Sequence, residues 1–135
     1  MSRITLAGCV ILDENGGLLL MHRNTPKRVQ WELPGGKVEE GEVPEQTAKR
    51  EIVEELGVSV RIIRKLGEQS FEEDGYVMDY IWFLADISNG DMPTLKEEKF
   101  DALEYFSWEE LQQESQLSAN AKNLVSAYLE EEIEL

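Results

Sequence analysis

Three glutamates crowd one short segment of the sequence. Glu51, Glu54 and Glu55 follow Arg50 on a predicted helix over residues 44–56. At about a hundred degrees per residue they form a stripe beside the apolar face of the helix. Their charges repel there unless they are protonated, paired or bound to a metal. Carboxylate oxygens suit hard divalent cations such as Mg²⁺ or Mn²⁺. The segment therefore indicates either a divalent metal site or, as the plainer alternative, a solvated acidic face.

A glycine loop just before this helix favours the metal site. Gly35 and Gly36 follow Pro34, and because they lack side chains their backbone can closely approach a metal ion or a phosphate. Pro44 suits the first turn of the helix, where its missing N–H costs nothing. Gly57 suits the position just after the last turn. Loop and helix thus form one continuous unit.

Apolar strands must hold that unit in place. The strands are predicted at 4–12, 18–23, 58–71, 76–87 and 103–107. The first two flank a glycine turn and can form a hairpin, and the third can also divide into two short strands. Helices are predicted at 108–115 and 121–135, the latter with a buried stripe of Leu124, Val125, Tyr128 and Leu129. The mixture predicts an α/β protein, with helices packed on a mixed sheet.

Size and charge exclude several classes of partner. The 135 residues suit one domain. With 28 acidic residues against 13 basic ones the net charge is −15, which repels nucleic-acid duplexes and anionic membranes. A small phosphorylated ligand is still compatible, because a bound cation can reverse the local charge. A single cysteine and the absence of a long apolar run predict a cytoplasmic protein. The sequence leaves open whether the protein is a monomer or a homodimer.

The glutamate segment resembles the signature of the Nudix hydrolase family. Gly36, five residues, Glu42, seven residues and then "REIVEELGV" match every fixed position of that signature, the Nudix box, over residues 36–58. The longer run 29–58 resembles the MutT branch in particular. The resemblance implies the Nudix fold, an α/β/α sandwich of a mixed β-sheet between helices, as a single domain over residues 1–135. It also implies hydrolysis of a nucleotide pyrophosphate by metal-activated water.

The same resemblance implies a role for each residue of the box. The positions that match metal ligands are Gly36, through its carbonyl, and Glu51, Glu54 and Glu55. Glu42 and Arg50 match positions that brace the loop and orient the glutamates. The expected cofactor is Mg²⁺, for which Mn²⁺ can substitute. Such ions polarise phosphoryl oxygens and lower the pKa of a bound water.

The general base is left open among three glutamates. Glu54 lies in the box, whereas Glu97 and Glu98 lie in the predicted loop 88–102. The run "EEKFDALEYF" resembles the family's pattern of a loop glutamate shortly before the last strand, and on that alignment Glu98 is the better match. Ordinary loop charge is the alternative for both loop residues.

Three residues outside the metal set are candidate substrate contacts. Gly35 offers its backbone to phosphates. Arg23 matches a family position that often contacts substrate phosphate, although an arginine at a strand end is commonly a surface residue. Asn120 matches the position at which an asparagine of the MutT branch reads a purine edge, or it caps a helix. The only histidine, His22, is expected to face away from the site.

The sequence favours a Mg²⁺-dependent pyrophosphohydrolase. Its expected reaction cleaves a nucleoside triphosphate, with an oxidised purine such as 8-oxo-dGTP as the best single candidate, to the monophosphate and pyrophosphate. The alternatives are hydrolysis of another nucleoside diphosphate derivative, such as a nucleotide sugar or a dinucleoside polyphosphate, and a non-catalytic nucleotide-sensing module. The complete glutamate set argues against the sensor, because a pure binder does not need it.

Overall fold

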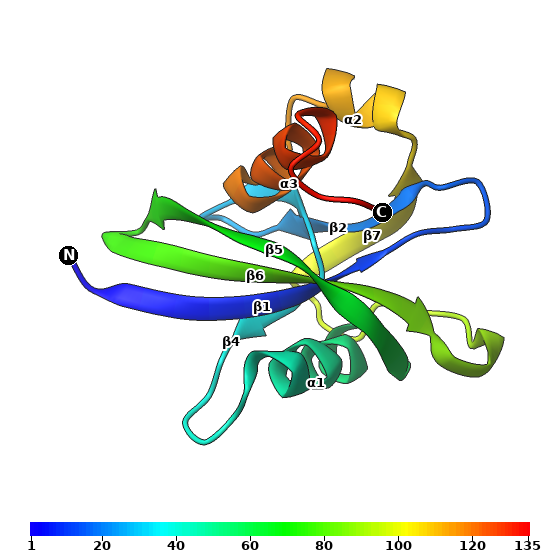
Figure 1. Cartoon of the computed structure of the whole chain (residues 1–135), viewed down its shortest axis with the longest axis horizontal. Helices are drawn as coiled ribbons and strands as arrows, with labels where there is room; N and C mark the ends of the chain where they lie inside the picture. Colours follow the sequence, from blue (N-terminus) through cyan, green and yellow to red (C-terminus); the bar gives the residue numbers. More distant parts are fainter.

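The computed structural model describes residues 1–135 and forms two sheets and three α-helices (Figure 1). The strands are β1 (Arg3–Ile11), β2 (Leu18–Asn24), β3 (Val29–Glu32), β4 (Gly35–Lys37), β5 (Val60–Glu73), β6 (Tyr76–Ile87) and β7 (Phe100–Phe106). The helices are α1 (Pro44–Leu56), α2 (Trp108–Gln113) and α3 (Ala119–Leu129), and a short 3₁₀ turn, η1, spans Ser88–Gly90. None of the helices is long and apolar enough to cross a bilayer.

The two sheets have the strand orders β4-β1-β6-β5 and β3-β2-β7. Strands β1 and β6 run parallel, whereas the other paired strands are antiparallel. Helix α1 covers one side of the sheets, and α2 and α3 cover the other (Figure 1). This layering of helices on a mixed sheet confirms the predicted α/β class.

The second half of strand β1, residues 7–11, is buried on both of its faces. Cys9 and Ile11 pack with Ile52 of α1, whereas Val10 between them joins the core under α3. Alternation of side chains across a strand explains how neighbours enter different cores. The glutamate helix is therefore anchored directly on the central strand.

The predicted hairpin of the first two strands is wrong. Strands β1 and β2 belong to different sheets and share only an isolated bridge between Leu12 and Leu18. β1 pairs instead with β4, along Leu6–Gly8, on one side and with β6 along its whole length on the other. The run 58–71 forms the single long strand β5 rather than two short ones.

Two short strands occupy a region expected to be irregular. Val29–Glu32 pairs with β2, and Gly35–Lys37 pairs with β1. Gly35 lies opposite Gly8 in that register, and a side chain on Gly35 would collide with the hydroxyl of Tyr80 and with the backbone of β1. The glycines that suggested a loop instead allow two backbones to pair beside a buried tyrosine.

The last helix is shorter than predicted. It begins at Ala119 and ends at Leu129, and Glu131 just beyond it adopts a left-handed φ of 60°. Of the predicted stripe Leu124 and Val125 are buried, whereas the side chain of Leu129 is half exposed. If the helix continued, Glu130 and Glu134 would lie four residues apart on one face, where like charges repel.

The last strand, β7, begins at Phe100, three residues earlier than predicted.

Cys9 should be chemically inert in the folded protein. The residue is fully buried and its Sγ lies 3.8 Å from the carbonyl oxygen of Ala48. Burial raises the pKa of the Cys9 thiol to about 12, and the thiolate is the reactive form. We expect a disulfide-exchange dye to label Cys9 rapidly only after unfolding in guanidinium. Fast labelling of the native protein would contradict this burial.

Candidate active site

Helix α1 carries the glutamates on a well-defined frame. Its first turn is closed by the Gln46 side chain, whose oxygen accepts from the Val43 N–H at 3.0 Å. Its last turn ends at Gly57, which has a left-handed φ of 67° and donates its N–H to the Val53 carbonyl. The predicted bounds of this helix are confirmed. Because Ile52 faces the core, the adjoining stripe carries the glutamates along the edge of the buried surface.

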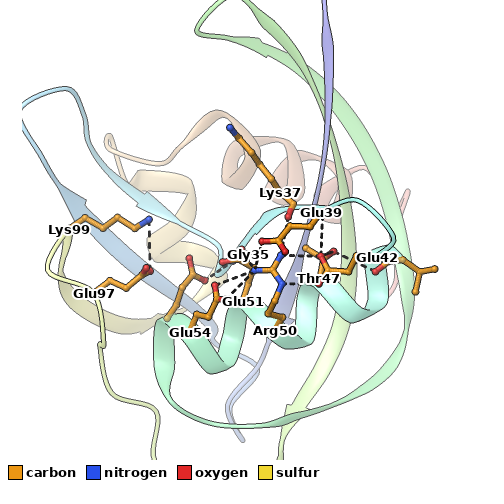
Figure 2. A network of polar contacts seen from close by, with 12 residues as sticks. Gly35, Lys37, Glu39, Glu42, Thr47, Arg50, Glu51, Glu54, Glu97 and Lys99 are labelled. Atoms are coloured by element: carbon orange, nitrogen blue, oxygen red, sulfur yellow. Dashed lines mark hydrogen bonds and ion pairs between the residues drawn. The ribbon is translucent and has the colours of Figure 1, made fainter.

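Arg50 lies at the centre of the polar network (Figure 2). Its guanidinium donates to both oxygens of Glu42 at 2.7 and 3.0 Å, to Glu51 at 3.0 Å and to Glu54 at 3.2 Å. A further hydrogen bond of 3.1 Å reaches the Lys37 carbonyl, so that the helix is tied to β4. This geometry suits the orienting role that the sequence predicts for Arg50.

Glu42 is held ionised by its partners. It accepts from Arg50, from the Thr47 hydroxyl and from the Glu39 N–H. Arg50 first, and then Thr47, lowers the pKa of Glu42 to about 2. These contacts are compatible with the bracing role that the family resemblance implies for Glu42.

Glu55 lies deepest in the cluster. Only 3% of its surface is exposed, and its Oε1 accepts from the Gly35 N–H at 2.9 Å. Burial, and then the charges of Glu51 and Glu97, raise its pKa to about 9. Burial also raises the pKa of Glu51. The cluster thus has an unfavourable concentration of negative charge, which a nearby cation would relieve.

The loop before β7 brings Glu97, rather than the better-aligned Glu98, to the cluster. The N–H groups of Thr94 and Lys96 donate to the carbonyls of Leu56 and Glu55 at 3.0 and 2.9 Å. The loop is therefore fastened to the end of α1, and Glu97 is close enough to raise the pKa of Glu55. Glu98 is exposed and forms no side-chain hydrogen bond or ion pair.

Glu97 has an unusual environment for a carboxylate. Its Oε1 is buried without a hydrogen-bond partner, and the nearest cation, the Nζ of Lys99, is 3.8 Å away (Figure 2). Buried polar atoms are rarely left unpaired, so such an atom indicates a missing ion, water or ligand.

The carboxylates do not already converge on one point. No group of three His, Cys, Asp or Glu side chains lies at metal-binding distance, because Arg50 draws Glu51 and Glu54 toward itself. The available donors nevertheless fit a hard divalent cation, since all are oxygens. Two features support that fit: the buried Glu97 oxygen that has no hydrogen bond, and the side-chain-free space at Gly36, which the Glu51 carboxylate borders.

A cavity of about 360 Å³ opens beside the cluster. Gly36, Glu51 and Glu55 line it together with Asn120 of α3. The cavity also contains four cationic side chains, Arg23, Arg28, Lys37 and Lys99. Its volume is within the range of small-molecule sites. A second, more apolar hollow near β1 and β2 is larger, at about 660 Å³, but includes none of the glutamates of the box.

Asn120 does not cap its helix. Ser118 is the N-cap of α3, and its hydroxyl accepts from the Ala121 N–H at 3.1 Å. The Asn120 side chain lies in the first turn, where it is buried and borders the cavity. The capping alternative is therefore wrong, and the position is compatible with ligand recognition.

Comparison with known proteins decides the family. The model of the NUDIX domain matches residues 3–128. The chain belongs to the Nudix family. A mouse (Mus musculus) relative called oxidized purine nucleoside triphosphate hydrolase is 48% identical over 91 residues, which cover 66% of this chain and 58% of that protein. The match thus spans less than two thirds of the relative's own length.

Solved structures agree with this assignment. The MutT protein from Methanosarcina mazei Go1 superposes with a TM-score of 0.85 over 97% of this chain and 96% of that chain, at 24% identity, and so shows the same fold. The MutT Nudix hydrolase from Burkholderia pseudomallei has a TM-score of 0.82 at 27% identity, over 93% and 98% of the two chains. The predicted family and its MutT-like branch are confirmed. Nudix proteins generally use divalent metal cations.

Two predicted positions of this Nudix chain are engaged within the protein. Arg23 lines the cavity, but its guanidinium donates two hydrogen bonds to Glu32, and a phosphate would have to share it. His22 contacts Asp101 at 2.7 Å and Gln116 at 3.1 Å and does not line the cavity, in line with its expected outward orientation.

Sequence reasoning missed some features of the Nudix site. Arg28 and Lys99 line the cavity although no motif includes them. Trp82 is buried in the core, and its indole N–H donates to Asn120. These contacts join distant segments, and only the fold brings them together.

Proposed function

We propose that this Nudix protein is a Mg²⁺-dependent pyrophosphohydrolase that cleaves a nucleoside triphosphate to the monophosphate and pyrophosphate. The observation that carries the proposal is the single cavity that Gly36, Glu51 and Glu55 share with Asn120. The cavity thus offers an acidic cluster that suits a cation and, separately, an amide that suits a nucleobase. The name of the mouse relative, oxidized purine nucleoside triphosphate hydrolase, supports an oxidised purine as substrate.

Mg²⁺ is assigned to the carboxylates of Glu51, Glu54 and Glu55 and to the Gly36 carbonyl. When bound, such an ion supplies polarisation of the phosphoryl oxygens and acidification of a water molecule. In this assignment Arg50 orients the glutamates. Its ion pairs with Glu51 and Glu54 must loosen before these two carboxylates can bind the cation.

The cations of the cavity offset the charge of the phosphates. Lys37 lines the cavity without an ion pair, and Lys99 has only the long contact of 3.8 Å with Glu97, whereas Arg23 donates two hydrogen bonds to Glu32. We assign phosphate contact first to the two lysines and to the Gly35 backbone, with Arg23 sharing its guanidinium. Glu97 is assigned as the proton acceptor, in preference to the sequence candidates Glu98 and Glu54.

A nucleotide panel tests the proposal. The purified protein is incubated with Mg²⁺ and oxidised or normal nucleoside triphosphates, nucleotide sugars and dinucleoside polyphosphates, and pyrophosphate is measured separately from orthophosphate. We expect pyrophosphate release from an oxidised purine triphosphate, and its loss on addition of a chelator. Activity confined to a sugar or dinucleotide would contradict the assigned substrate. Silence across the panel would contradict catalysis and favour the sensor.

A further inference from the structure

One indole holds the buried amide of the cavity in place. Trp82 of β6 is 1% exposed, and its Nε1 donates to the Oδ1 of Asn120 at 2.9 Å. Asn120 is itself 7% exposed and borders the cavity. Neither side chain forms another hydrogen bond with a protein side chain or backbone. The contact is therefore the single polar restraint on the Asn120 amide.

The chemistry of the indole determines which way that amide points. An indole N–H only donates, whereas an amide has one accepting and one donating end. The reverse orientation of Asn120 would set its NH₂ group against the Trp82 N–H, two donors facing each other in a buried place. The Oδ1 atom must therefore face Trp82, and the NH₂ group must face elsewhere.

The free end of the amide is accessible. The NH₂ group of Asn120 has no hydrogen-bond acceptor in the protein. The Oε1 of Glu97 is the one fully buried side-chain polar atom without a partner, so the Nδ2 of Asn120 is not fully buried. The Nδ2 atom therefore retains accessible surface, and Asn120 lines the cavity. A donor with a fixed direction is thus offered to whatever occupies that end.

We propose that Trp82 is a positioning residue for base selection: it fixes the Asn120 amide so that a hydrogen-bond donor is presented to the cavity. The presented donor favours a ring edge with a carbonyl acceptor, as in 6-oxopurines, over the amino group of 6-aminopurines. This inference rests on the proposed nucleotide function and specifies which nucleotides the cavity prefers. Discrimination of this kind is effective because the wrong ligand leaves polar groups unpaired.

Inosine and adenosine nucleotides provide a clean test, because both lack the 2-amino group and they differ at the 6 position. The values of kcat and KM for pyrophosphate release are measured with dITP and dATP. We expect the wild type to prefer dITP. Trp82→Phe retains an aromatic ring but loses the N–H. In this variant the kcat/KM for dITP divided by the kcat/KM for dATP should fall about tenfold, mainly through KM, because one hydrogen bond is lost.

Trp108→Phe is the matched control. Trp108 also donates its indole N–H, to the Gly16 carbonyl at 3.0 Å, but it does not line the cavity. The same chemical change there should leave the preference for dITP unaltered. A folded Trp82→Phe variant with the wild-type preference would overturn the proposal, and so would a wild type that does not distinguish dITP from dATP.

A second variant covers the possibility that Trp82→Phe does not fold. Asn120→Asp keeps an oxygen for the Trp82 N–H but replaces the presented donor with an acceptor, so the preference should shift toward dATP. An unchanged preference would overturn the proposal. If the wild type hydrolyses no nucleotide, the proposed function fails by itself. Calorimetric binding of dIMP and dAMP then decides this inference separately, since tighter dIMP binding supports it and equal binding overturns it.

Discussion

Replacing Glu97 with glutamine should lower kcat by about 10²–10⁴-fold, the usual contribution of a general base, whereas Glu98→Gln should leave kcat nearly unchanged. The reason is positional. Glu97 has a buried oxygen without a hydrogen bond, near enough to Glu55 to raise its pKa, and Glu98 is exposed. Glutamine has the same shape, so that only the ability to accept a proton or bind a cation is removed. Initial rates at saturating Mg²⁺ and nucleotide measure the difference.

The Glu97 experiment separates a base from a metal ligand. Loss of a base lowers kcat even when Mg²⁺ is saturating, whereas loss of a ligand also raises the Mg²⁺ concentration needed for half-maximal rate. The fold should survive in Glu97→Gln, because the substitution removes one negative charge from a crowded cluster. An inactive Glu98→Gln beside an active Glu97→Gln would show that the sequence alignment, rather than the geometry, identifies the base.

Adding one methyl group at Gly36 should impair activity about 10–100-fold, the usual effect of disturbing the support of a metal site, and leave folding nearly intact. The nearest atoms to a Cβ on Gly36 are all in the Glu51 carboxylate. This end of a flexible side chain can swing aside without moving the backbone. The expected defect therefore lies in where Glu51 points, and hence in catalysis.

Gly35→Ala is the matched comparison for Gly36→Ala. A Cβ there would lie 2.5 Å from the Ala7 carbonyl oxygen and 2.6 Å from the Gly8 Cα, and would also collide with the Tyr80 hydroxyl. Backbone atoms within a paired sheet cannot swing aside, and overpacking costs about 1–3 kcal/mol. Thermal melting should show a clear loss of stability for Gly35→Ala only. Equal losses in the two variants, or full activity in Gly36→Ala, would contradict this account.

Helix α1 could be predicted to the residue because its signals are local. Pro44 and Gly57 mark its two ends, and the spacing of its apolar residues determines which side is buried. The residues Glu51, Glu54 and Glu55 needed only this helix to lie along one stripe. Family resemblance added the role of Arg50, and the structure supplies its contacts with Glu42 and the glutamates.

The sheet pairings could not be predicted in the same way. A hairpin of the first two strands is the natural expectation when two apolar runs flank a glycine turn. The observed partners of β1 are instead β4 and the distant β6, which runs parallel to it. Those pairings depend on burial of both faces of β1, a property of the whole core.

The identity of the loop glutamate was also beyond the sequence. Glu97 and Glu98 are adjacent and chemically identical, and their difference comes from hydrogen bonds between the loop and the end of α1. The contact between Trp82 and Asn120 similarly joins residues 38 positions apart. The sequence suggested Asn120 as a candidate but contained no local signal for the partner that orients it.

Binding of Mn²⁺ tests the central claim, that the glutamate stripe of α1 holds a divalent cation. Free Mn²⁺ is counted by electron paramagnetic resonance during titration of the wild type, Glu51→Gln and Glu45→Gln. Glu45 is an exposed glutamate in the first turn of the same helix. We predict a saturable site in the wild type and in Glu45→Gln, weakened by more than about tenfold in Glu51→Gln. Equal binding by all three proteins, or no saturable site in any, would contradict the account.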